Sequence, residues 1–135
     1  MLFRSMLEKV KDADVVIVNP SEFAVALEYD EVRSAVPIVL AKGRGEIAAS
    51  IRERAAAAGV PLVSAPPLAR AIFFTTEVDE PIPEGLYRAV AAVLAYVFRL
   101  SASTPGADTP DVPRPVLSPE FMFDETGKRL SEGQR

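Results

Sequence analysis

Two short apolar runs near the N-terminus are separated by four polar or turn-forming residues. Residues 15–18 and 23–27 are rich in β-branched and aromatic side chains, which favour buried strands. The break between them reads Asn19-Pro20-Ser21-Glu22. Asparagine followed by proline is a favoured order at the start of a β-turn, because proline presets its own φ angle. The pattern therefore predicts a β-hairpin with Asn19 and Pro20 at its apex.

The apolar spacing of the other segments predicts a small mixed domain. Helical periodicity over residues 1–12 places Leu2, Met6, Leu7 and Val10 on one face. Further helices are predicted over residues 46–58, over 68–75 and from Pro83 onwards, with strands over 36–41 and 60–63. We therefore expect an α/β (mixed α+β) single domain. Its element order would be α-β-β-β-α-β-α-α, with helices surrounding one four-stranded mixed sheet.

The composition changes after Leu100. Residues 101–135 hold five of the twelve prolines, interspersed with Ser, Thr, Gly and Asp. Such a stretch buries too little apolar surface to offset its ordering entropy. We expect a connecting helix over 1–12, a folded domain over 13–100 and a disordered tail over 101–135. The exception is the apolar island at residues 119–123, which can dock on this domain or on a partner.

Composition excludes several classes of site. The chain has no cysteine and no histidine, which removes disulfides, cysteine nucleophiles, histidine triads and Cys/His zinc sites. A small hydrolase is a weak alternative, since no Gly-x-Ser-x-Gly elbow is present. The net charge of −4 and the lack of a basic stripe argue against nucleic acid as a partner. An RNA-binding sandwich of the ribosomal-protein kind stays open as a rival, and a salt-dependent RNA affinity would support it.

Other segments carry weaker signals. The apolar run at residues 89–98 is shorter than the roughly 20 residues of a membrane helix, and the N-terminus lacks a signal-peptide pattern. Gly43-Arg44-Gly45 lacks the spacing and the Lys-Ser/Thr ending of a phosphate loop, so we expect a loop that enters a helix. Arg70 and the acidic residues 77–80 are expected to be solvated surface. No cofactor or metal site is expected, and the chain is expected to be a cytoplasmic domain with no membrane segment of its own.

The Asn-Pro bond has distinctive chemistry. Deamidation of asparagine normally begins with attack by the next residue's amide nitrogen, and Pro20 has no N–H. The remaining route is attack by the Asn19 side-chain nitrogen on its own main-chain carbonyl. This closes a succinimide and cuts the chain before Pro20. An amide is a poor nucleophile, so the reaction needs a near-attack geometry that a strained turn can impose. The simpler interpretation is that Asn-Pro only starts a turn.

The segments around this turn resemble the cytoplasmic switch region of the FlhB/YscU family, the export-apparatus proteins of flagellar and virulence type III secretion. The family motif is Asn-Pro-Thr-His, an aromatic residue and Ala-Val-Ala-Leu, against Asn-Pro-Ser-Glu-Phe-Ala-Val-Ala-Leu here. The resemblance runs in order through residues 14–30, 39–43, 46–53, 66–71 and 89–100.

The resemblance implies a function and a site. It implies a domain at the cytoplasmic face of the bacterial inner membrane, where self-cleavage permits a change of export-substrate class. Its partners would be export-gate components, secreted substrates and a ruler protein. Asn19 matches the cyclising asparagine, Pro20 the leaving residue and Ser21 the family threonine. Glu22 replaces the family histidine, and a carboxylate is a weaker base than imidazole near neutral pH. Slow cleavage is therefore expected.

A second implied feature is a small apolar patch that docks early export substrates, at the positions of Val36, Pro37, Ala91 and Leu94. The alternative is that these are ordinary core residues. The non-enzymatic alternative for the whole chain is a stand-alone scaffold of this fold that binds export components without cutting itself. Self-cleavage would in any case be a single turnover. Flagellar and virulence apparatus are not distinguished.

Overall fold

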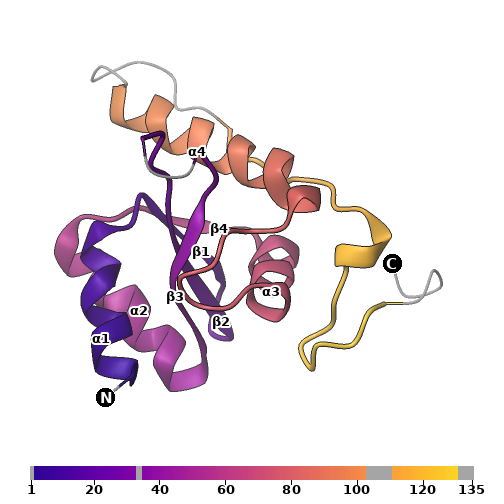
Figure 1. The fold of residues 1–135 in the computed structure, drawn as a ribbon, viewed down its shortest axis with the longest axis horizontal. Helices are drawn as coiled ribbons and strands as arrows, with labels where there is room; N and C mark the ends of the chain where they lie inside the picture. The colour runs from indigo at the N-terminus through magenta and orange to yellow at the C-terminus, as the bar shows by residue number, and fades with distance from the viewer. Residues whose placement is uncertain (1, 33–34, 103–110, 131–135) are drawn as a thin grey trace.

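The structure is a computed structural model that describes residues 2–32, 35–102 and 111–130. Figure 1 shows the helices gathered around a central sheet. The elements in chain order are α1 (Leu2–Glu8), the 3₁₀ helix η1 (Lys9–Asp12), β1 (Val15–Asn19), β2 (Phe23–Glu28), β3 (Ile38–Arg44), α2 (Gly45–Ala58), β4 (Leu62–Ser64), α3 (Pro66–Thr75), η2 (Glu84–Leu86), α4 (Tyr87–Ala102) and η3 (Pro119–Phe121).

The four strands form one mixed sheet in the order β3-β2-β1-β4. β1 runs antiparallel to β2 and parallel to β4, and β2 runs antiparallel to β3. The predicted four-stranded mixed sheet is therefore confirmed. β1 is an inner strand, with a neighbour on each side.

Alternate residues of the strands feed two separate hydrophobic clusters, one on each face of the sheet. Val16 and Val18 pack with α1, η1 and α2, whereas Val15 and Ile17 pack with α3 and α4. In Figure 1, α1 and α2 lie together on one side of the strands and α3 on the other. Because both faces are covered, the strands read as continuous apolar runs. Of the predicted N-terminal helical face, Met6 and Val10 are buried, and the side chain of Leu2 lies outside the described residues.

The last helix packs as its periodicity predicts. Five apolar residues recur at helical spacing along this segment, and all of them are buried: Leu86, Val90, Val93, Leu94 and Val97. Residues 84–102 are together long and apolar enough to cross a membrane. Their apolar face instead belongs to the larger of the two hydrophobic clusters, so this is a core helix of the domain.

Several predicted boundaries are wrong by a few residues. The predicted loop at Gly43-Arg44-Gly45 is instead the end of β3 and the first residue of α2. Gly43 has no side chain, and Ile47 occupies the space that a Cβ would need. The strand can therefore run directly into the helix. Pro83 is extended and caps η2, and α4 begins only at Tyr87.

The C-terminal segment differs from the predicted disordered tail over residues 111–130. Leu117 and Phe123 are buried, and the Phe123 ring lies 5.8 Å from that of Phe74. The Arg70 Nε donates a 2.9 Å hydrogen bond to the Phe123 carbonyl. Prolines reduce the conformational entropy that this segment loses on docking, so a few apolar anchors suffice to hold it. The prediction for residues 103–110 and 131–135 lies outside the described residues.

A small loop follows this docked segment. The Asp124 carboxylate accepts hydrogen bonds from the Thr126 hydroxyl and from the backbone N–H of Lys128. These bonds, the Thr126 hydroxyl first, hold the pKa of Asp124 below its ordinary value. The carboxylate closes the loop through these hydrogen bonds.

Candidate functional site

The Asn-Pro turn lies at the tip of the β1–β2 hairpin, as predicted. Asn19 is the last residue of β1 and pairs with Phe23, the first residue of β2. The backbone N–H of Glu22 donates to the Asn19 carbonyl oxygen at 2.9 Å, which closes the turn. Ser21 has a φ of 72°. Proline in second position and a positive φ in third fit a type II turn. A residue other than glycine in the left-handed region stores backbone strain.

The Asn19 side chain is half-buried, and its amide nitrogen is not engaged. The Nδ2 atom is buried and has no hydrogen-bond partner among the described residues. Buried polar atoms are almost always paired, and leaving one unpaired is costly. An unengaged amide nitrogen is free to turn toward its own carbonyl carbon. Pro20 and Ser21 are exposed, and Glu22 is half-buried.

The Asn19 carbonyl, which would be the electrophile of the predicted cleavage, is held by a backbone hydrogen bond. The Asn19 carbonyl oxygen already accepts the Glu22 N–H at 2.9 Å. During attack, negative charge develops on this oxygen, and a preorganised N–H donor stabilises such charge. Since the donor belongs to the main chain, this contribution does not depend on which side chain stands at position 22.

Contacts beyond the turn were not predictable from the sequence. The Glu22 carbonyl accepts a hydrogen bond from the Gly45 N–H at 3.0 Å, and the Val18 carbonyl accepts one from the Ala65 N–H at 3.0 Å. The Arg44 guanidinium lies over the Phe23 ring, with its Cζ atom 4.8 Å from the ring centroid. The only sequence signal for any of these is the glycine that stands directly before a helical pattern.

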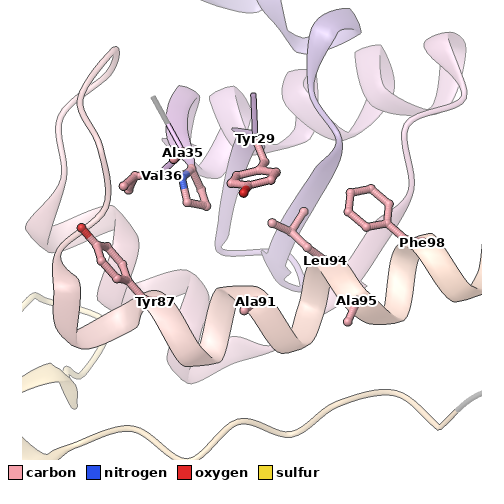
Figure 2. Close-up of a pocket in the computed structure, with 9 residues that line it drawn as sticks. Tyr29, Ala35, Val36, Tyr87, Ala91, Leu94, Ala95 and Phe98 are labelled. Atoms are coloured by element: carbon pink, nitrogen blue, oxygen red, sulfur yellow. The ribbon is translucent and has the colours of Figure 1, made fainter. Parts of the chain in front are cut away.

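The four residues predicted to form an apolar docking patch lie around one pocket. The pocket has a volume of about 370 Å³ and lies between the β2–β3 connection and α4 (Figure 2). Leu94 is buried and Ala91 is exposed, while Val36 and Pro37 are half-buried. The structure therefore brings these four positions together. The full lining is Tyr29, Ala35, Val36, Pro37, Tyr87, Ala91, Leu94, Ala95 and Phe98.

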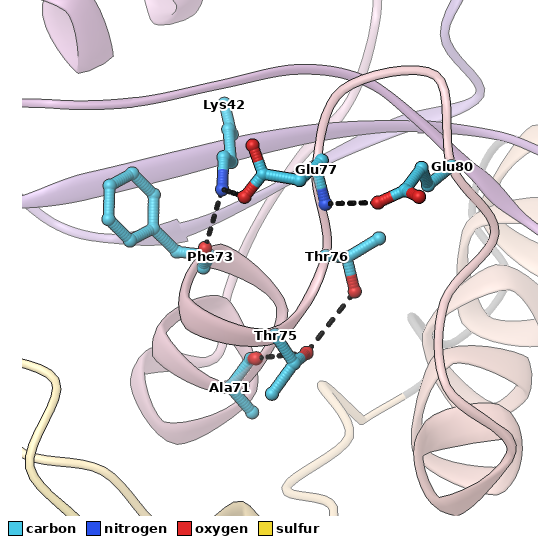
Figure 3. Close-up of polar contacts among 7 residues, drawn as sticks. All are labelled: Lys42, Ala71, Phe73, Thr75, Thr76, Glu77 and Glu80. Carbon is cyan, nitrogen blue, oxygen red and sulfur yellow. Dashed lines mark hydrogen bonds and ion pairs between the residues drawn. The ribbon is translucent and has the colours of Figure 1, made fainter.

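The acidic residues after α3 have structural partners. Glu77 pairs with Lys42, whose Nζ also donates to the Phe73 carbonyl at 2.9 Å (Figure 3). Asp79 pairs with Lys9 at 3.0 Å, and a Glu80 carboxylate oxygen accepts the Glu77 N–H. All three acidic side chains are exposed, as expected, and their contacts link the segment after α3 to β3 and to η1. Arg70, expected to be surface, instead anchors the C-terminal segment through Phe123.

Comparison with known proteins decides the family. The model of a family described as the FlhB HrpN YscU SpaS family matches residues 1–97. The chain belongs to this family. Its members include the flagellar biosynthetic protein FlhB of Yersinia enterocolitica, 46% identical over 90% of this chain, and the hypersensitivity response secretion protein HrcU of Ralstonia nicotianae, 43% identical over 75%. The chain is thus a part of the type III export apparatus family, as the resemblance implied.

Solved structures of the FlhB/YscU family share the fold. The crystal structure of the cytoplasmic domain of FlhB from Shewanella putrefaciens superposes with a TM-score of 0.82 at 46% identity, over 90% of this chain and 95% of that one. A mutated EscU C-terminal domain, at 24% identity, has a TM-score of 0.66 over 69% of this chain and 99% of its own. By the FlhB match the chain is the family's cytoplasmic domain, at the inner face of the membrane. It spans about a third of the length of its curated relatives, with 32% of the Yersinia protein covered.

Proposed function

We propose that this domain is the substrate-specificity switch of a type III export apparatus and that it cuts itself between Asn19 and Pro20. One observation carries the cleavage proposal. The Asn19 Nδ2 is buried and unpaired, in a strained turn whose Asn19 carbonyl is already bound by the Glu22 N–H. The nucleophile is therefore free and the electrophile is held, which is the arrangement that cyclisation requires.

The reaction balances without a cofactor. The Asn19 Nδ2 attacks the Asn19 carbonyl carbon and forms a five-membered succinimide ring. The bond from that carbon to the Pro20 nitrogen breaks, and the proton lost by Nδ2 passes to the Pro20 nitrogen. The products are residues 1–19, ending in a succinimide that water later opens, and residues 20–135, beginning with the secondary amine of Pro20. Each chain does this once.

The glutamate at position 22 is expected to make this cleavage slow. The family histidine can relay the proton as neutral imidazole, and a carboxylate is a poorer base for that task. Intact-mass spectrometry of the purified chain at neutral pH tests the proposal, and fragments 1–19 and 20–135 should accumulate over hours to days. A chain that stays intact after days would instead be the alternative, a scaffold that binds export components without cutting itself.

The two fragments are expected to stay together after the cut. Residues 15–18 of the shorter fragment are buried between β2 and β4, so the cleaved domain should elute as one species. Replacing Ile17, which is 0% exposed, by alanine should cost at least about 2 kcal/mol. That loss corresponds to about thirtyfold weaker association of the fragments. Denaturant titration of cleaved protein, followed by size exclusion, measures this effect.

A matched control for Ile17→Ala is Val32→Ala, since Val32 is 94% exposed. The control should dissociate at the same denaturant concentration as the wild type. Equal midpoints for the two variants would contradict the assignment of β1 as the strand that holds the fragments together.

The apolar pocket between the β2–β3 connection and α4 is proposed to dock early export substrates at the export gate. Its lining includes the exposed aromatic ring of Phe98, and a carboxylate in such an apolar pocket would be desolvated by a bound peptide. Leu94→Asp should therefore weaken binding of an early substrate by tenfold or more. Calorimetric titration with a rod-type subunit measures the affinity. Unchanged binding in a folded Leu94→Asp variant removes the docking proposal.

Leu94 is buried, so a second pair of variants separates docking from folding. Ala91 and Ala92 are neighbouring exposed residues of α4, and of these two the pocket lining includes only Ala91. Ala91→Asp should weaken substrate binding while Ala92→Asp should not. The ruler protein and the other gate components are proposed partners of the same domain.

A further inference from the structure

The carbonyl groups on both sides of the Asn-Pro turn are held from outside the hairpin. On the N-terminal side, the Val18 carbonyl accepts the Ala65 N–H at 3.0 Å. On the C-terminal side, the Glu22 carbonyl accepts the Gly45 N–H at 3.0 Å. Asn19, Pro20 and Ser21 therefore lie between two carbonyl groups, those of Val18 and Glu22, that are hydrogen-bonded to neighbouring segments.

These two donors directly follow the strands that flank the hairpin: Gly45 follows β3, the neighbour of β2, and Ala65 follows β4, the neighbour of β1. Gly45 is the first residue of α2, which packs in the cluster of Val16 and Val18. Ala65 directly precedes α3, which packs in the cluster of Val15 and Ile17. The two hydrogen bonds thus link the flanks of the turn to the start of a helix on each face of the sheet.

Strained turns persist only where the surrounding structure over-determines them. The φ of 72° at Ser21 stands in a turn whose ends are already paired, Asn19 of β1 with Phe23 of β2. The two outer hydrogen bonds restrain the Val18 and Glu22 carbonyls that flank this turn, and so limit how far the Glu22 N–H can move from the Asn19 carbonyl. Reacting atoms that must meet within about 3–3.5 Å lose about a hundredfold in rate for a 1 Å misplacement.

We propose that Gly45 is a positioning residue for cleavage at Asn19, acting through its N–H bond to the Glu22 carbonyl. Gly45 has a φ of 58°, a backbone conformation that residues other than glycine, asparagine and aspartate rarely adopt. No atom lies within 4 Å of the place where its Cβ would stand. A substitution there therefore acts through the backbone and not through a clash. This inference rests on the proposed self-cleavage.

Gly59 provides a matched control in the same helix. It caps the C-terminal end of α2 with a φ of 75°, and it too has no atom within 4 Å of a built Cβ. Gly45→Ala and Gly59→Ala thus impose a similar backbone strain at the two ends of one helix. We expect Gly45→Ala to slow the appearance of fragment 20–135 by about tenfold, and Gly59→Ala to leave the rate within about twofold of the wild type.

A rescue variant distinguishes positioning from loss of stability. Asparagine tolerates the left-handed region, so Gly45→Asn should keep the N–H in place and cut within about threefold of the wild-type rate. Equal cleavage rates for Gly45→Ala and Gly59→Ala would overturn the inference and leave the proposed function standing.

Amide hydrogen exchange gives a readout that does not need cleavage. In an Asn19→Ala background the chain cannot cut, yet the Glu22 N–H still faces the carbonyl of residue 19. Adding Gly45→Ala should speed exchange of the Glu22 amide about tenfold, and adding Gly59→Ala should not change it. Unchanged exchange in both double variants would overturn the inference. If the wild type never cuts, the proposed cleavage fails and this measurement alone still decides whether Gly45 holds the turn.

Discussion

Replacing Asn19 by alanine is expected to abolish cleavage, so that the purified chain stays in one piece for as long as it is observed. Alanine has no amide nitrogen, and Asn19 is the single asparagine of the chain. No other residue can form the same succinimide. The measurement is intact mass at neutral pH over days, beside the wild type, and fragments of the wild-type sizes from the alanine variant would contradict the assigned nucleophile.

Loss of cleavage in this variant will not reflect unfolding. The Asn19 Nδ2 is buried without a partner, and removing an unsatisfied buried group relieves a desolvation penalty of about 1–3 kcal/mol. The melting temperature of Asn19→Ala should therefore be no lower than that of an uncleaved wild type. A control for the leaving group is Pro20→Ala. It restores the backbone N–H that proline lacks, so ordinary deamidation of Asn19 should compete with chain cutting.

Replacing Glu22 by histidine is expected to speed cleavage by about a hundredfold, the lower end of what a positioned proton acceptor contributes. The half-buried side chain at this position is close to the turn, and neutral imidazole accepts a proton readily near neutral pH. The rate of this variant should rise with pH up to about 7 and then level off, because the imidazole must lose its proton, with a pKa of about 6.5, to act as a base. Quenched time points analysed by mass spectrometry measure both effects.

Glu22→Gln separates the side chain at this position from its backbone N–H. Glutamine has nearly the same shape, lacks the charge and keeps the N–H that binds the Asn19 carbonyl. A rate within about threefold of the wild type would show that the backbone donor, and not the carboxylate, supports the slow reaction. If Glu22→His cleaves no faster than the wild type, a proton relay from position 22 is contradicted.

Much of the fold was predictable because apolar periodicity and turn chemistry agree. The hairpin at Asn19 was read correctly from residues with strong backbone preferences. The errors lie where tertiary contacts override local signals. The pair of glycines at positions 43 and 45 reads as a loop, yet the close approach of Ile47 lets the strand continue into α2. In the segment at 111–130, docking of the apolar island at 119–123 was allowed for, but the buried Leu117 was not, because such anchors are few and far from their partners along the chain.

The candidate site was predictable only in part. The possible cleavage at the Asn19-Pro20 bond was predictable because proline lacks a backbone N–H. The four pocket positions were predicted from the family resemblance. The contacts that hold the turn come from Gly45 and Ala65, which are distant in sequence and act through main-chain atoms. Side-chain type does not encode main-chain hydrogen bonds, and the one sequence signal for these contacts is the glycine directly before the pattern of α2.

The inner position of β1 has a mechanical consequence. The shorter fragment would enter from the N-terminal helix and end inside the sheet, with β2 on one side and β4 on the other. Tension applied along that helix would load the strand in shear, so the bonds to both neighbours would resist at once instead of unzipping one by one. Cleavage of the turn would therefore leave the domain assembled, and dissociation of the two fragments would be a separate, force-dependent step.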